Sequence, residues 1–100
     1  MLGESTYIVK IDPDLIDLAP VLMESLNQEL DKMMLHIDDA NFEKIEELAH
    51  SSRGAALTFG FDAYARKLRQ LKKTSLDKDV LETIIIFKEL RLLLDNVEFI

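Results

Sequence analysis

Cysteine is absent from this chain of 100 residues, and glycine and proline are scarce, with three and two copies. A chain without cysteine forms no disulfides and has no thiol chemistry, which suits a reducing cytoplasm. The scarcity of glycine and proline, and the lack of repeats or low-complexity segments, argue against linkers and repeat arrays. We therefore expect a single cytoplasmic domain.

Long apolar runs and an excess of positive charge are also missing. No uninterrupted apolar stretch approaches the roughly 18 residues that a membrane-spanning helix needs. The N-terminus shows no basic region followed by an apolar run, so no signal peptide is expected. The formal net charge of −7 argues against a nucleic-acid partner, because phosphates attract basic proteins. We expect neither membrane insertion nor nucleic-acid binding.

The chain is rich in apolar residues at helical spacing. Its composition, 48% apolar and 31% charged, is ordinary for one globular domain. Apolar positions recur every three or four residues in segments that predict helices over about 12–36, 41–59, 62–73 and 77–95. Short connections make successive helices antiparallel neighbours, so we expect an all-α fold, an antiparallel up-down four-helix bundle over residues 12–100.

The start of the chain carries further signals. Asp12 and Pro13 predict a helix start, with Asp12 as the cap and Pro13 in the first turn. Pro20 should then kink the first helix, or end a short helix before the long one begins. Residues 1–11 are expected to form an N-terminal arm, extended over 7–11. The other strand-like run, 84–86, lies inside a helical pattern, so we expect no second strand.

A histidine and a glycine share the exposed face of the second predicted helix. At about 100° per residue, His50 lies roughly 140° and Gly54 roughly 180° from the apolar Ile45. Glycine costs about 1 kcal/mol relative to alanine inside a helix, and an exposed face offers no packing reason for it. Access to the His50 ring is the simplest reason, which indicates a reactive histidine. The buried stripe of this helix should contain Ile45, Leu48, Ala49, Ser52, Ala56 and Phe59.

The segment from His50 to Gly60 resembles the signature of histidine phosphotransfer (HPt) domains. The family pattern is His, any residue, an apolar residue, Lys or Arg, Gly, two small residues, a spacer, an apolar residue and Gly. One position departs, because Ser52 stands at the apolar position; its hydroxyl could donate to the Leu48 carbonyl. The likeness extends over roughly residues 11–95. The matching residues are His50, Arg53, Gly54, Ala55, Ala56, Phe59 and Gly60.

The resemblance implies a phosphorelay intermediate of two-component signalling. His50 would take a phosphoryl group from the aspartate of one receiver domain and pass it to another, because histidine is nucleophilic at neutral pH. The partners would be response-regulator receiver domains and, as a further candidate, a hybrid histidine kinase. No cofactor of its own is expected, since the Mg²⁺ belongs to the receiver and the sequence shows no metal-ligand cluster. The sequence also contains no ATP-binding motif, so we expect a phosphoryl carrier without autokinase activity.

The residues around His50 can be given roles in such a transfer. Arg53 can meet phosphoryl oxygens with its guanidinium group, or pair with Glu46 or Glu47. Gly54 keeps the surface open, and Leu57 should be a part-exposed apolar contact. His36, at a helix end, should be structural or solvent-facing. The residues expected to contact a partner are Glu47, Ser51, Leu57 and Thr58.

Two other interpretations of the function stay open, and so does the role of the basic residues of the third helix. A non-catalytic HPt-like adaptor would bind a receiver or kinase and transfer nothing. A helical dimerisation module is suggested by the very apolar fourth helix around 84–87, although we favour a monomer. The basic residues of the third helix are expected to be a solvated face, which could steer an acidic receiver pocket if that face adjoins His50.

Overall fold

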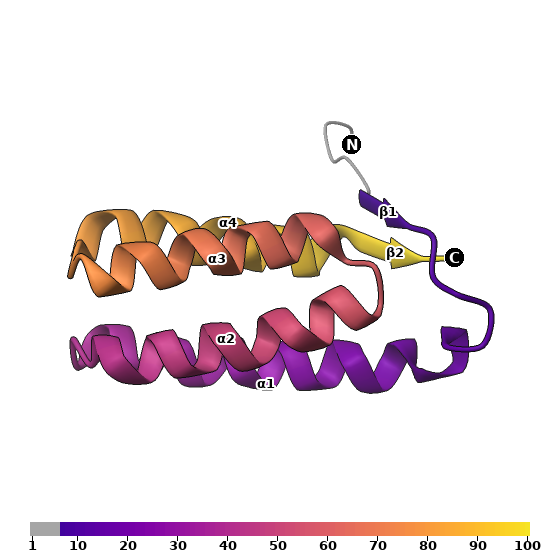
Figure 1. The fold of residues 1–100 in the computed structure, drawn as a ribbon, viewed down its shortest axis with the longest axis horizontal. Coiled ribbons are helices and arrows are strands. Elements are labelled where there is room, and N and C mark those ends of the chain that lie inside the picture. The colour runs from indigo at the N-terminus through magenta and orange to yellow at the C-terminus, as the bar shows by residue number, and fades with distance from the viewer. Residues whose placement is uncertain (1–6) are drawn as a thin grey trace.

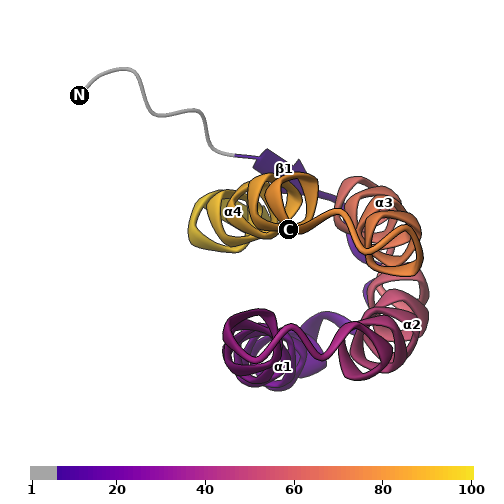
Figure 2. The same cartoon turned by 90° about the vertical axis from the view of Figure 1, so that its left-hand side faces the viewer.

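Four antiparallel helices make up the fold in the computed structural model, which describes residues 7–100. Figure 1 shows α1 lying beside α2 and α3 beside α4, and the end-on view in Figure 2 shows the helices following one another in sequence order. The expected up-down four-helix bundle is confirmed. The four α-helices are α1 (Ala19–Asp38), α2 (Phe42–Thr58), α3 (Asp62–Leu76) and α4 (Val80–Asn96), and a short 3₁₀ helix, η1 (Ile16–Leu18), precedes them.

The helix start expected at Asp12 is wrong, because the long helix α1 begins only at Ala19. The Asp12 carboxylate instead accepts a hydrogen bond of 2.9 Å from the backbone N–H of Asp14, which favours a turn. Pro20 lies in the first turn of α1, where its missing N–H leaves no helical bond unmade. A short helix followed by a longer one is therefore the arrangement found around Pro20.

The two ends of the described chain meet in a small parallel sheet. Strand β1 (Tyr7–Val9) pairs with strand β2 (Val97–Phe99), with Tyr7 opposite Val97. Of the extended segment expected at 7–11, residues Tyr7–Val9 form a strand. The expectation of no second strand is wrong, because a three-residue strand such as β2 leaves little periodic pattern in the sequence. Residues 1–6 of the expected arm lie outside the described residues.

The three turns between the helices use one backbone motif, in which a residue with positive φ follows the helix. Gly60 (φ 78°) ends α2, and its N–H donates to the Leu57 carbonyl at 3.1 Å. Ala40 (φ 54°) and Lys78 (φ 56°) fill the same position after α1 and α3, without the freedom of glycine. The end of the third helix, expected near residue 73, is thus wrong, because α3 continues to Leu76. The residue with positive φ that follows α3 is a lysine rather than a glycine.

Lys78→Gly is expected to raise the free energy of unfolding by up to about 1 kcal/mol, because glycine adopts positive φ without a Cβ clash. Urea unfolding measures the change. Lys88→Gly is the matched control: Lys88 is exposed in the middle of α4, and glycine there should cost about 1 kcal/mol. A Lys78→Gly protein less stable than the wild type would contradict the argument.

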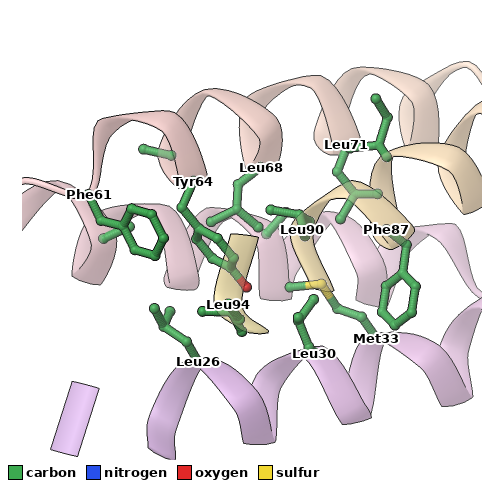
Figure 3. Close-up of a cluster of buried hydrophobic side chains, with 14 of the residues drawn as sticks. Leu26, Leu30, Met33, Phe61, Tyr64, Leu68, Leu71, Phe87, Leu90 and Leu94 are labelled. Carbon is green, nitrogen blue, oxygen red and sulfur yellow. The ribbon is translucent and has the colours of Figure 1, made fainter. Parts of the chain in front are cut away.

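The core joins large side chains from α1, α3 and α4 to small side chains from α2. Figure 3 shows the Tyr64 phenol reaching from α3 into this core, where its hydroxyl has no hydrogen-bond partner among residues 7–100. Burial raises the pKa of the Tyr64 phenol above its ordinary value, so the group stays neutral. The buried residues of α2 are Ile45, Ala49, Ser52 and Ala56, and the last three of them are small. The large buried side chains include Leu26, Leu30, Met33, Phe61, Leu68, Leu71, Phe87, Leu90 and Leu94.

Candidate functional site

The candidate site lies on α2, whose start is set by a side-chain cap. The Asn41 carboxamide oxygen accepts a hydrogen bond of 3.3 Å from the backbone N–H of Lys44, as is typical of a capping asparagine. The inner face of the helix is then occupied by the expected stripe, with Leu48 and Phe59 half-buried at its edges. The buried members of the stripe are Ile45, Ala49, Ser52 and Ala56.

His50 and Gly54 both lie on the exposed face of α2, as their spacing predicts. A Cβ atom added at Gly54 would meet nothing within 4 Å, so packing does not require glycine. Its backbone does not require glycine either, because Gly60 is the glycine with positive φ. Gly54 therefore lowers the stability of the helix, and neither packing nor backbone conformation explains its presence. This supports a role in access to His50.

Three of the residues expected to contact a partner lie exposed on the same helix. Leu57 keeps 48% of its surface exposed, which is consistent with an apolar contact beside a reactive group. The Glu47 carboxylate pairs with the Lys44 ammonium at 3.4 Å, both well exposed. Thr58 is exposed, and its hydroxyl donates to the Gly54 carbonyl at 3.0 Å.

The two serines that follow His50 contact a carboxylate from α1. Ser52 is fully buried, and its hydroxyl donates a hydrogen bond to the Glu29 carboxylate. Ser51, also expected to contact a partner, is exposed and donates to the same carboxylate at 3.4 Å. The bond expected from Ser52 to the Leu48 carbonyl is wrong, because a charged acceptor binds a hydroxyl more strongly than a neutral carbonyl. Glu29 thus accommodates a polar residue where the family pattern has an apolar one.

His50 lines a hollow of about 330 Å³, here called the acidic hollow, with Glu43, Glu46, Glu47 and Lys72. Three carboxylates and one ammonium group therefore line the same hollow as the imidazole. Lys72 comes from α3, and no ion pair of Lys72 is found within the described part of the chain. The sequence assigned Lys72 to a solvated face, and only the packing of α3 on α2 brings it to His50.

Arg53 lines a second hollow of about 230 Å³, here called the basic hollow. Its guanidinium forms no ion pair with any carboxylate of residues 7–100, so the pairing considered with Glu46 or Glu47 is not found. Arg66 and Arg69 of α3 line the same hollow, which places the basic face of α3 against the site. The sequence left this adjacency open. The other lining residues are Leu57, Asp62 and Ala65.

The second histidine has a different environment. His36 lies half-buried in the last turn of α1, and its Nδ1 is enclosed without a hydrogen-bond partner in the part of the chain that is described. His50 is the exposed histidine of the two. Within residues 7–100, no group of His, Asp and Glu side chains is placed to hold a metal ion, and no helix could span a membrane.

Comparison with known proteins agrees with the helical fold. The family model of the Hpt domain matches residues 14–98, which is most of the chain. No curated protein and no solved structure matches the chain. The matched region contains all four α-helices and the residues that line the acidic and basic hollows. The chain therefore belongs to the Hpt domain family, the phosphotransfer modules of two-component signalling.

Proposed function

We propose that this protein is a phosphorelay intermediate that carries a phosphoryl group on His50 between the aspartates of receiver domains. The observation that carries the proposal is the exposed His50 ring beside the open surface of Gly54 on a rigid helix. A receiver must bring its aspartate within bonding distance of the ring, and that approach needs a bare surface. The four-helix scaffold supplies this surface and holds it in place.

In the proposed transfer, a ring nitrogen of His50 attacks the phosphorus of an aspartyl phosphate in line with the leaving oxygen. The N–P bond forms, the P–O bond to the aspartate breaks, and the carboxylate leaves with the electron pair. In the onward step, the carboxylate of a second receiver attacks, the N–P bond breaks, and the imidazole leaves. Mg²⁺ bound in the receiver would neutralise the phosphoryl oxygens. This chain contributes the nucleophile, its orientation and nearby positive charge, so we propose a carrier without autokinase activity.

The experiment that tests the proposal combines transfer with phosphate chemistry. The purified protein is incubated with each receiver domain of the source organism, phosphorylated on its aspartate. We expect uptake from at least one receiver, as phosphate that is lost in acid and kept in base, which is typical of an N–P bond. An adaptor without transfer activity would form a complex with a receiver and take up no phosphate. That result would contradict the proposal.

Arg53→Ala is expected to slow transfer and to speed loss of phosphate from the protein, each by about tenfold, while melting barely changes. The guanidinium has no ion pair to lose within residues 7–100, and a charged hydrogen bond to phosphate is worth enough for such an effect. Arg53→Lys should keep most of the activity, since the positive charge remains. Transfer reactions quenched at timed intervals measure the rates of phosphoryl transfer and of phosphate loss, and a thermal melt measures stability. Wild-type transfer together with a much lower melting temperature would make Arg53 a structural residue.

A second candidate function has one observation in its favour. Leu81, Ile85 and Leu92 keep 76%, 49% and 62% of their surface exposed along one side of α4. Such a stripe could pair with another helix, as a dimerisation module would require. Light scattering on the wild type and on Leu92→Ser separates the two functions. A dimer that Leu92→Ser disrupts and His50→Ala leaves intact would favour dimerisation.

A further inference from the structure

The surface around His50 is divided by charge. The acidic hollow, on the side of the start of α2, presents the carboxylates of Glu43, Glu46 and Glu47. The basic hollow, on the side of the end of α2, presents three guanidinium groups, from Arg53, Arg66 and Arg69. Figure 2 shows why one surface can hold both, since α2 and α3 lie side by side. A partner that reaches His50 must therefore meet opposite charges on the two sides of the ring.

The arginines of the basic hollow keep their charge available. None of the three forms an ion pair with a carboxylate within residues 7–100, and the nearby Asp62 neutralises none of them by direct contact. Uncompensated arginines on one face are unexpected in a chain with a net charge of −7. Arg66 and Arg69 also line an adjoining hollow of about 360 Å³ with Gln70 and Lys73, so the basic face continues along α3.

The chemistry of the basic hollow fits carboxylates. A guanidinium group presents a planar fork of N–H donors that matches the two oxygens of a carboxylate. Leu57, half-exposed in the same hollow, adds an apolar contact of the kind found beside charged groups at interfaces. A nucleic acid fits less well than a carboxylate-rich surface. The acidic hollow on one side of His50 would repel a continuous line of phosphates.

We propose that the basic hollow docks the carboxylate-rich phosphorylation pocket of the receiver and so orients the receiver over His50. This proposal rests on the proposed function and names the surface that selects the partner. Arg66 and Arg69 attract the acidic phosphorylation pocket of the receiver and hold it in place. The acidic hollow of this protein repels the same pocket, so the receiver binds in one orientation. The arginines of α3 act on association, since charges at the edge of an interface mainly change the rate at which partners meet.

The test is a charge reversal, Arg66→Glu with Arg69→Glu, using the phosphorylated receiver that labels the wild type fastest. The second-order rate constant of transfer should fall about tenfold or more at low salt, and the difference should shrink at high salt. The rate at saturating receiver should stay near that of the wild type, because His50 and Arg53 are unchanged. Arg66→Lys with Arg69→Lys keeps the charge and should keep most of the association rate.

The matched control reverses the same amount of charge elsewhere, with Lys32→Glu and Lys88→Glu. Both lysines are exposed, lie on α1 and α4, and form no ion pair within the described residues. The control should change the rate much less than the arginine reversal. Equal effects in the two variants, or no effect of the arginine reversal, would overturn the proposal while leaving transfer by the wild type intact. A wild type that takes no phosphate from any receiver would overturn both proposals. If the reversed variant melts early, Arg66→Gln with Arg69→Gln replaces it and should show the smaller loss that neutralisation predicts.

Discussion

His50→Gln is expected to fold as the wild type does and to accept no phosphoryl group from a phosphorylated receiver. Glutamine is a good helix former of similar polarity, and the exposed His50 ring makes no hydrogen bond to any of residues 7–100. Stability should therefore barely change. The amide nitrogen of glutamine is not a nucleophile, so the loss of transfer should be complete. Transfer from the phosphorylated receiver, measured beside a thermal melt, shows both outcomes.

His36→Gln is the control for this experiment. His36 lies half-buried at the end of α1, so its replacement should leave phosphoryl uptake intact even if stability falls. Uptake of phosphate by His50→Gln would show that another residue is the acceptor. Label found on His36 in the wild type would have the same meaning. Either result would remove His50 from the site.

Gly54→Gln is expected to slow transfer by about a hundredfold while the protein stays helical. A long side chain at this position would lie over the approach to His50, and a small misplacement of reacting groups costs about that much. Gly54→Ala should match or exceed the wild-type stability by up to about 1 kcal/mol, because its Cβ meets nothing within 4 Å. Transfer kinetics and urea unfolding on both variants test the two halves of the argument.

Gly60→Ala provides the contrast, since Gly60 has a φ of 78° and serves the turn rather than the site. It should lose about 1 kcal/mol of stability and keep its transfer rate. The expected pattern is therefore opposite at the two glycines. Unchanged transfer by Gly54→Gln would show that the receiver reaches His50 from a direction that position 54 does not cover, and would end the steric interpretation.

The sequence alone determined the features that depend on local periodicity. Apolar residues at helical spacing predicted four helices, and the bundle found has all four. The angle between Ile45 and His50 predicted an exposed histidine, because a helix fixes the direction of each side chain relative to its neighbours. The Asn41 cap is equally local, since the side chain and the N–H that it accepts from are three residues apart.

Local sequence signals predicted the ends of the helices least well. A glycine marked the end of α2, but Ala40 and Lys78 close α1 and α3 with the same positive φ and no glycine. The position of the end of α3 was therefore missed. At Asp12 the signal was real but ambiguous, because a side chain that accepts a backbone N–H starts a turn as readily as a helix.

Tertiary structure decided every feature that joins residues far apart in the chain. Strand β1 is completed by a segment about 90 residues away, and Ser52 finds its acceptor in Glu29 on another helix. Lys72 and Arg66 line hollows beside the His50 helix only because α3 packs against α2. Periodicity shows which face of a helix is buried, but the choice of neighbour and its rotation follow from packing of the whole core. The exposed histidine was thus evident from the sequence, and the charges near it came from the fold.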